Sequence, residues 1–414
     1  MERRNITDSP MEIYIHIPFC IKKCDYCDFL SGPSGPKEQA DYVDALLEEI
    51  NAAEEGKGRS VSSVFIGGGT PSVLDERFIG EILNHIRRKF QIADHAEITI
   101  EVNPGTADRN KLQAYRTYGI NRLSIGLQSP DDRELKILGR IHNYEQFLET
   151  YRSAREAGFD NINIDLMSAI PDQTYEGWIH NLRTVAGLDP EHISAYSLIV
   201  EEGTPLYEEY GEMCADLEKY GDYASMPKRL QTKYEGCKCL PDEETDRNMY
   251  HHTKTTLAKL GYERYEISNY ARPGYACRHN IGYWNRTDYL GIGLGASSLI
   301  DPMRWKMTSD LSDYLECGKN QGDFANLREE VQTLRVSERM EEFMFLGLRL
   351  TKGIELQTFE HQFGKSFWDV YQNAADKLFS EQLLCLDESK KNLRLTDYGV
   401  DVSNYALAEF LLDY

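Results

Sequence analysis

The chain has 414 residues, of which 41% are hydrophobic, and this is enough for two or three domains around a large core. Its 46 Lys and Arg against 68 Asp and Glu leave a formal net charge of −22, which argues against non-specific binding to nucleic acids or anionic membranes. Residues 1–11 lack the apolar stretch of a secretory signal, and no run of about 18 apolar residues predicts a membrane span.

The first half of the chain alternates between predicted strands and helices. We expect strands at residues 12–17, 61–66, 97–102, 122–127, 161–166 and 192–198. We expect helices at residues 37–55, 77–90, 108–118, 143–157 and 175–187. This alternation predicts a parallel sheet with right-handed crossovers, although periodicity alone does not separate a β/α barrel from an open doubly wound sheet.

Polar side chains and cysteines gather where these predicted strands end. The set comprises the cysteines after residue 17, the segment 67–70, Glu101, Gln128, Asp165 and Ser197. In a β/α barrel the carboxyl ends of the strands meet at the edge where the functional site is built. We therefore expect a site at this edge.

The regular alternation ends after residue 205. Residues 206–244 show no clear periodicity and predict an insertion or a long surface loop. Cys214 and the Cys237–Cys239 pair lie there, but one C-x-C pair with a distant thiol is a weak basis for a second metal site. A helix is expected at residues 246–260 and a strand at residues 264–268, and an aromatic-rich loop at residues 269–284 follows.

The chain is predicted to be mainly helical from about residue 310. Helices are expected at residues 337–350, 367–380 and 398–412, with a hairpin at residues 383–386 and 392–395. This order suggests a winged-helix-like unit, to which an acidic chain gives no reason to assign DNA binding. The predicted domains are residues 1–205 (core), 206–244 (insertion or loop), 245–309 (continuation of the core) and 310–414 (C-terminal domain).

Three cysteines after the first predicted strand carry the most specific signal. Cys20, Cys24 and Cys27 have C-x3-C-x2-C spacing, which lets a short loop place three thiolates on one face of a cubane iron–sulfur cluster. Phe29 stands where a fourth cysteine would follow, so one iron is left open for a small molecule. A zinc knuckle is the alternative, but zinc sites usually add a second ligand pair nearby, and none follows.

This motif, preceded by Y-I-H-I-P-F at residues 14–19, resembles the radical SAM enzymes, and within them the group around oxygen-independent coproporphyrinogen III oxidase. The resemblance implies an α/β fold, a partial six-unit β/α barrel followed by a smaller, mainly helical, winged-helix-like C-terminal domain. It implies a [4Fe–4S] cluster on Cys20, Cys24 and Cys27, with S-adenosylmethionine (SAM) at the open iron. Nine cysteines and an oxygen-sensitive cluster favour the reducing cytoplasm, and an electron donor such as a flavodoxin or ferredoxin is expected.

The same resemblance assigns SAM contacts near the cluster. Gly68, Gly69 and Thr70 match the segment that binds the SAM amino group, and three successive glycines leave backbone N–H groups accessible to a carboxylate or an amine. Tyr14 and Tyr26 flank the cysteines, and the resemblance places both near SAM. Tyr14 is equally well explained as an inward-facing strand residue.

Further matches follow the later strands. Glu101 corresponds to a contact of a first SAM, and Gln128, Arg140 and Asp165 correspond to contacts of a second SAM. Ser197 matches less closely. The sequence leaves open whether a second SAM binds, and it assigns no catalytic acid, base or nucleophile.

Two functions within this group compete: an oxidase that decarboxylates coproporphyrinogen III, and a HemW-type heme chaperone that passes heme to an acceptor protein. Phe29 replaces the fourth cysteine of the oxidase pattern, and only 19 residues precede Cys20, whereas the oxidase has a long extension there. Both features favour the chaperone. A heme-degrading radical SAM methyltransferase is the third, weaker alternative.

The motif H-N-x-x-Y-W, formed by His279, Asn280, Tyr283 and Trp284, resembles the signature of the chaperone branch. His is a usual axial ligand of heme iron, so His279 is the first candidate ligand, with His251 and His252 as alternatives. We expect a heme acceptor protein as partner, no nucleic acid, and membrane contact only through a membrane-bound acceptor.

Overall fold

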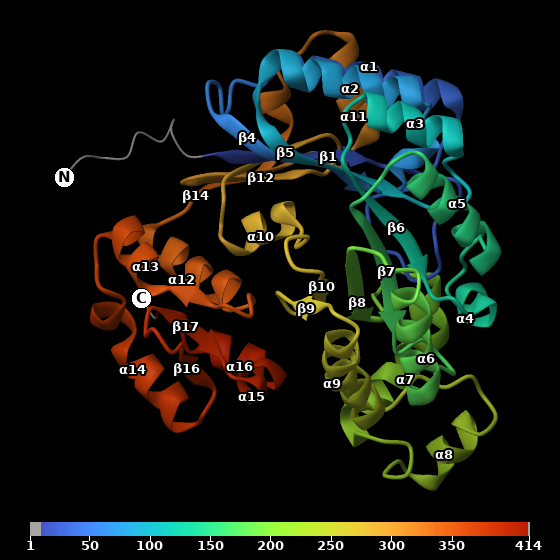
Figure 1. Cartoon of the computed structure of the whole chain (residues 1–414), viewed down its shortest axis with the longest axis vertical. Coiled ribbons are helices and arrows are strands. Elements are labelled where there is room, and N and C mark those ends of the chain that lie inside the picture. Colours follow the sequence, from blue (N-terminus) through green and yellow to red (C-terminus); the bar gives the residue numbers. More distant parts are fainter. Residues whose placement is uncertain (1–9, 413–414) are drawn as a thin grey trace.

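A twelve-stranded sheet organises the computed structural model, which describes residues 10–412 (Figure 1). Its central strands are all parallel, as the sequence predicted. In spatial order they are β11 (Tyr289–Ile292), β1 (Met11–Ile17), β4 (Ser60–Gly68), β5 (Gln91–Val102), β6 (Arg122–Gln128), β7 (Ile162–Ser168) and β8 (His192–Ser197). The carboxyl ends of these strands therefore lie along one edge.

Antiparallel strands extend the sheet on both sides. β12 (Ser297–Ile300), β13 (Met303–Met307) and β14 (Arg328–Thr333) follow β11, while β10 (Asn269–Ala271) and β9 (Glu263–Arg264) follow β8. Within residues 10–412 the outermost strands β14 and β9 do not pair with each other, so the sheet stays open. The predicted partial barrel of six strand–helix units is confirmed.

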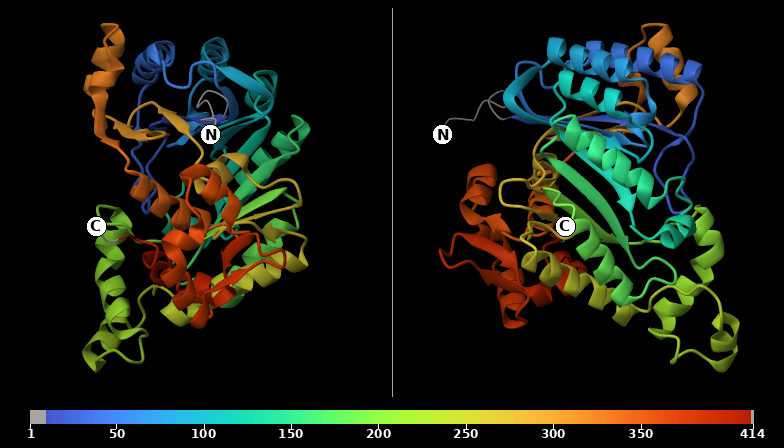
Figure 2. Two further views of the ribbon diagram at one scale, coloured as in Figure 1. Left: turned by 90° about the vertical axis from the view of Figure 1, so that its left-hand side faces the viewer. Right: turned by 45° about the vertical axis from the view of Figure 1, so that its right-hand side comes forward.

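Helices cover the outer face of the sheet (Figure 2). They include α1 (Pro36–Ala52), α2 (Glu76–Lys89), α3 (Arg109–Thr117), α4 (Asp132–Ile137), α5 (Tyr144–Glu156) and α6 (Tyr175–Ala186). Asp75, Asp108 and Asn143 cap α2, α3 and α5 by accepting backbone N–H groups of the first turn. These polar caps mark the helix starts in the sequence, so the predicted starts lie close to the observed ones.

Alternate side chains of β1 face different surroundings, as a strand requires. Ile13, Ile15 and Ile17 are fully buried in the hydrophobic core that the sheet shares with the helices. Tyr14 and His16 lie on the concave face, where the Tyr14 hydroxyl and His16 Nδ1 are 3.1 Å apart. The sheet therefore has an apolar convex face and a polar concave face.

Residues 206–244 are not a long loop. They contain α7 (Pro205–Tyr220) and α8 (Lys228–Tyr234), which pack around a small core of their own. Leu206, Tyr210 and Met213 form the narrow buried stripe of α7. Glu, Asp and Lys surround this narrow stripe, so the apolar period of helix α7 is hard to see in the sequence.

Three other predicted elements also differ. The strand expected at residues 264–268 does not form, since β9 ends at Arg264 and β10 begins only at Asn269. The loop expected at residues 269–284 contains β10 and the helix α10 (Arg278–Trp284). The last helix is split into α15 (Asp397–Asp401) and α16 (Ser403–Ala408), because Val402 between them has φ −113° and ψ 34°.

The C-terminal domain has a separate hydrophobic core and is mainly helical, as expected. Its larger elements are α12 (Val336–Gly347), α13 (Leu356–Phe363) and α14 (Phe367–Ser380), with a small antiparallel sheet of β15 (Ile354–Glu355), β17 (Asn392–Leu395) and β16 (Leu384–Leu386). Helix α11 (Leu311–Lys319) instead packs on α1, and β14 extends the large sheet. The large sheet therefore continues beyond residue 310, where the sequence placed the C-terminal domain.

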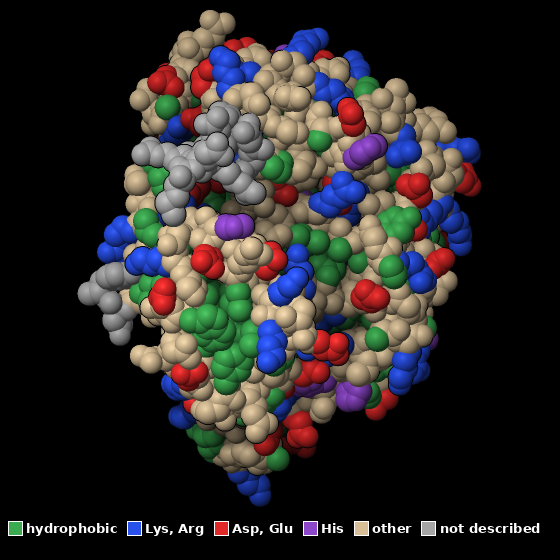
Figure 3. Space-filling view, turned by 60° about the vertical axis from the view of Figure 1, so that its left-hand side comes forward, with side chains coloured by type: hydrophobic (Ala, Val, Ile, Leu, Met, Phe, Trp, Pro, Cys, Tyr) green, Lys and Arg blue, Asp and Glu red, His purple; other side chains and the backbone are tan. Residues whose placement is uncertain are grey.

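The surface in Figure 3 mixes the two signs of charge. Lys and Arg side chains lie scattered among Asp and Glu, and the described side chains of that face form no basic stripe. None of the helices in residues 10–412 combines the length and apolar composition needed to cross a bilayer. The signal-peptide prediction concerns residues 1–11, of which 1–9 lie outside the described residues, as do residues 413–414 of the last predicted domain.

Candidate cluster and cofactor site

Cys20, Cys24 and Cys27 lie in one loop at the carboxyl end of β1. The short strand β2 (Phe19–Cys20) pairs with β3 (Gly32–Pro33) and closes the base of the loop. All three thiols are free and half-buried. Burial raises the pKa of Cys27, and the nearby Cys24 and Cys20 add to the rise, so the three thiols are close enough to interact.

Two of the three sulfurs accept hydrogen bonds from outside the loop. The Thr70 hydroxyl donates to Cys20 Sγ at 3.4 Å, and Arg140 Nη1 donates to Cys24 Sγ at 3.4 Å. Donors of this kind favour the thiolate form that a cluster ligand needs. Thr70 and Arg140, both predicted as cofactor contacts, therefore meet the cysteine loop directly.

The three thiols are compatible with a cubane cluster. In residues 10–412 no three His, Cys, Asp or Glu side chains are placed to hold one metal ion. A cubane binds each thiolate at a different iron, so its ligands need not converge on one point. Phe29, which stands where a fourth cysteine would follow in the motif, is 62% exposed.

The glycine segment after β4 packs against the base of the cysteine loop. The Gly69 N–H donates to the Ile17 carbonyl at 2.8 Å, and the Thr70 N–H donates to the Phe19 carbonyl at 2.7 Å. A Cβ atom at residue 69 would lie 2.7 Å from the Phe19 carbonyl oxygen, so only glycine allows this approach.

The expected role of the backbone N–H groups in this segment needs correction. Those of Gly69 and Thr70 bind carbonyls of the cysteine loop, and that of Gly68 donates to Glu101 Oε2 at 3.0 Å. They are therefore not free to hold a ligand. The Glu101 carboxylate is the acceptor that the segment presents, and an amino group is a donor that suits it.

Glu101 and Asp165 lie at inward-facing positions of β5 and β7. Burial, together with the charge of Asp165, raises the pKa of Glu101 to about 8, even though the Gly68 N–H and Arg122 oppose the rise. Burial also raises the pKa of Asp165, which accepts hydrogen bonds from Asn163 at 2.7 Å and Ser124 at 3.3 Å. The two carboxyl groups are close enough to influence each other.

Arg140 links the cysteine loop to the next strands. Its Nη2 donates to Asn103 Oδ1 at 2.8 Å and to the Gly126 carbonyl at 2.5 Å. Burial raises the pKa of the Tyr26 phenol, and the neighbouring Arg140 charge opposes that rise.

Gln128 has φ +71°, and its Oε1 accepts a hydrogen bond from Tyr196 at 2.7 Å. Positive φ in a residue other than glycine is strained and clusters at functional sites.

Ser197 and the H-N-x-x-Y-W motif make their contacts with residues outside the cysteine loop. The Ser197 hydroxyl donates to Asp246 Oδ1 at 2.7 Å, on α9 (Glu243–Lys259). The motif forms α10, where the Arg349 guanidinium lies 4.7 Å from the Trp284 ring centre. Asn280 is half-buried in the same helix, and Tyr283 stacks edge-on against Tyr289.

The geometry does not favour His279 as a heme ligand. The side chain is buried, with Nδ1 2.8 Å from the Ser63 hydroxyl and Nε2 3.1 Å from the Tyr283 hydroxyl, so both ring nitrogens are occupied. The alternatives lie on α9, where His251 Nε2 is 3.2 Å from Asp401 and His252 Nδ1 bonds to the Asn248 carbonyl.

Three site residues escaped the sequence analysis. His16 Nε2 lies 2.9 Å from the Leu30 carbonyl, Asn103 Nδ2 donates to the Thr70 hydroxyl at 2.7 Å, and the Arg122 charge acts on both Glu101 and Asp165. Asn103 could have been found, because it follows β5 directly as the other candidates follow their strands. The alternation of β1 and β6 would have placed His16 and Arg122 on the concave face.

A buried pair closes the other end of the concave face. Burial raises the pKa of Glu12 to about 8 and lowers the pKa of His279 to about 3. Their 3.7 Å contact is therefore between neutral groups near pH 7 and not an ion pair. A Cβ atom at residue 282 would lie 2.1 Å from Glu12 Oε1, so Gly282 lets α10 enter the barrel.

Comparison with known proteins gives two family matches. The model of the radical SAM superfamily matches residues 14–185, and the model of the HemN C-terminal domain matches residues 334–402. The heme chaperone HemW of Lactococcus lactis is 33% identical over 98% of both chains. That of Escherichia coli is 38% identical over 69% of both chains. The solved structure of E. coli coproporphyrinogen III oxidase (HemN) superposes with a TM-score of 0.78 at 24% identity, covering 98% of this chain and 91% of that one.

The Glu12 environment predicts a pH dependence of stability. Because its folded pKa, about 8, exceeds the ordinary value of 4.5, Glu12 stabilises the fold fully below pH 4.5 and loses this contribution as pH rises to 8. The Glu12→Gln side chain cannot ionise. The free energy of unfolding of this variant should therefore fall less between pH 5 and 8 than that of the wild type, by on the order of 1–3 kcal/mol. Denaturant unfolding at several pH values measures this. The exposed Glu81→Gln is the control, and parallel curves for wild type and Glu12→Gln would contradict the account.

Proposed function

The chain belongs to the radical SAM superfamily, within it to the family of proteins named heme chaperone HemW, and from this premise we propose that it binds heme and transfers it to an acceptor protein. It binds a [4Fe–4S] cluster and SAM as members of the superfamily do. One observation carries the proposal: the similarity to the HemW proteins runs through both domains.

The residues that would hold the cluster are Cys20, Cys24 and Cys27, with Thr70 and Arg140 donating to two of the sulfurs. When bound, the cluster supplies the electron for reductive cleavage of SAM. The chain itself contributes positioning. Glu101, held by the Gly68 N–H, is an acceptor for the SAM amino group, and Tyr14 and Tyr26 border the same region.

The remaining predicted contacts fall into two groups. Gln128, Arg140 and Asp165 surround the carboxyl ends of β6 and β7, where a second SAM or another ligand would lie. Ser197 bonds to α9 and carries no ligand role here. The oxidase gains no support from its solved structure, since 24% identity establishes the fold alone.

Partners and location complete the proposal. Reduction of the cluster would require an electron donor, for which a flavodoxin or ferredoxin is suitable, and the cargo would require a heme acceptor. Cys20, Cys24 and Cys27 are free, as are the other cysteines of the described chain, which suits the reducing cytoplasm. No nucleic acid is part of this function, and membrane contact would come through a membrane-bound acceptor.

The three cysteines are tested by spectroscopy. Protein reconstituted with iron and sulfide without oxygen should show [4Fe–4S] absorption, and Cys20→Ser, Cys24→Ser and Cys27→Ser should each lose most of it, because each removes one thiolate. Cys385→Ser on β16 is the control and should retain the absorption. Full clusters in all three variants would refute the assignment.

Glu101 is tested by SAM binding to the reconstituted protein. Glu101→Gln should weaken binding about tenfold, because the amino group loses a charged acceptor. With a pKa of about 8, the Glu101 carboxyl must lose its proton to pair with an ammonium group, so wild-type affinity should rise from pH 6 to 7.5. Calorimetric titration at both pH values measures this. Equal affinity and equal pH dependence in the variant would exclude the contact.

The function itself is tested by comparing two reactions. One sample of reconstituted protein receives heme, and another receives coproporphyrinogen III with SAM and a reductant. We expect stable heme uptake, followed by heme transfer to an added heme-free acceptor, without vinyl product in the second sample. Multiple turnovers to protoporphyrinogen would instead establish the oxidase.

A further inference from the structure

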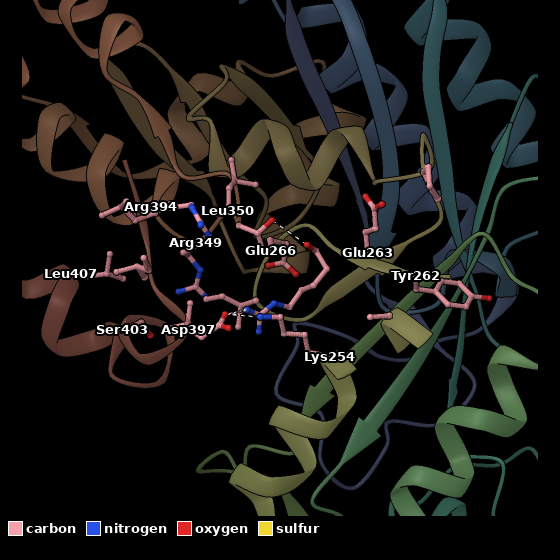
Figure 4. Close-up of a pocket in the computed structure, with 18 of the residues that line it drawn as sticks. Lys254, Tyr262, Glu263, Glu266, Arg349, Leu350, Arg394, Asp397, Ser403 and Leu407 are labelled. Atoms are coloured by element: carbon pink, nitrogen blue, oxygen red, sulfur yellow. Dashed lines mark hydrogen bonds and ion pairs between the residues drawn. The ribbon is translucent and has the colours of Figure 1, made fainter. Parts of the chain in front are cut away.

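A cavity of about 480 Å³ lies between the large sheet and the C-terminal domain (Figure 4). Helix α9 and the chain around β9 form one side. The segment after α12, strand β17 and helices α15 and α16 form the other. Its lining includes no residue of the cysteine loop or the glycine segment, so this cavity is separate from the candidate cluster site. Its volume falls within the range of about 300–1,000 Å³ that is typical of small-molecule sites.

Both domains contribute apolar walls to this cavity. The apolar lining residues include Ala258, Tyr262, Ile267 and Pro273 from the sheet side and Leu348, Leu350, Leu395, Val400 and Leu407 from the C-terminal domain. Leu348, Leu350 and Leu395 are buried. An apolar cavity between two domains suits a ligand with a large hydrophobic body.

The charged groups of the lining are unevenly paired. Lys254 and Asp397 neutralise each other at 2.6 Å, and Glu266 Oε1 accepts the Ser268 N–H at 2.8 Å. Neither Arg349 nor Arg394 has a carboxylate of the described chain within ion-pair distance, although the nearby charge of Arg394 helps to lower the pKa of Asp397 and of Asp387.

Arg349 is the more enclosed of the two unpaired guanidinium groups. Its Nε is buried without a hydrogen-bond partner, and the group lies over Trp284 at 4.7 Å. Figure 4 shows Arg349 and Arg394 extending from the C-terminal domain beside Leu350. Arg349 is half-buried and Arg394 is exposed, and carboxylates bind guanidinium groups through paired hydrogen bonds. The cavity therefore suits a hydrophobic ligand that carries carboxylates.

We propose that this cavity is the heme site, with the porphyrin ring between the two domains and its propionate carboxylates at Arg349 and Arg394. This assignment rests on the proposed function, which supplies a ligand with both a flat apolar ring and two carboxylates. The lining contains no His, Cys or Met, and the Tyr262 hydroxyl is already bonded to the Pro190 carbonyl at 2.8 Å. The lining therefore recognises the ring and its carboxylates and not the iron.

The test titrates the full chain with heme and with iron-free protoporphyrin IX, following absorption and fluorescence quenching. Wild type should bind both porphyrins with affinities within about threefold of each other, because no lining residue binds the iron. Arg394→Gln, on the exposed side of β17, and Arg349→Gln should each weaken both porphyrins about tenfold. Arg349→Lys keeps a charge near Trp284 and should recover part of the affinity.

A matched control removes the same charge elsewhere. Arg88→Gln, on the exposed face of α2, should leave porphyrin binding unchanged, and all variants should keep the iron–sulfur absorption. If both Arg349→Gln and Arg394→Gln bound heme with wild-type affinity, the assignment of heme to this cavity would be wrong, while the proposed function would stand. Binding of heme without protoporphyrin IX would also overturn it, since the iron would then dominate. A wild-type chain that binds neither porphyrin would refute the site and the proposed function together.

Discussion

The contact between the glycine segment and the cysteine loop is the constraint on which the rest of the site depends. Two backbone hydrogen bonds join Gly69 and Thr70 to the carbonyls of Ile17 and Phe19, and a side chain at residue 69 would clash there. The ends of β1 and β4 are thereby fixed side by side, which lets the Thr70 hydroxyl reach Cys20 Sγ. The parallel sheet therefore fixes the position of the cysteine loop.

The concave face extends this arrangement inward. Glu101, Asp165 and Arg122 occupy inward positions of neighbouring strands, and burial shifts the pKa of both carboxyl groups upward. Glu101 accepts the Gly68 N–H and Asp165 accepts hydrogen bonds from Asn163 and Ser124, whereas Arg122 Nε is buried without a hydrogen-bond partner and acts on the two carboxyl groups through its charge. The same face carries the neutral Glu12–His279 pair where α10 enters. The two ends of the concave face therefore differ in role. The carboxyl ends of the strands form the ligand region, and the other end is closed by the packing of α10 against Glu12.

Much of the fold was predictable because apolar periodicity, caps and turns agree along residues 11–198. The sequence also indicated the cysteine loop, the glycine segment and Glu101, since each directly follows or ends a strand. It did not reveal that the N–H groups of Gly68, Gly69 and Thr70 are already bonded, because their partners come from other strands. Likewise, His279 looked like a ligand by residue type, and only the packing of α10 against Ser63 and Tyr283 places it in a structural role. The cavity between the domains had no sequence signal, because its residues come from five separate segments.

Electron paramagnetic resonance of the reduced, reconstituted protein tests the central claim most directly. With three thiolates and one open iron, the chain should bind about four irons, and its [4Fe–4S]⁺ signal should shift when SAM is added. A signal that is unchanged by saturating SAM, or a chain that takes up one zinc ion in place of the cluster, would contradict a three-cysteine cluster with an open coordination position.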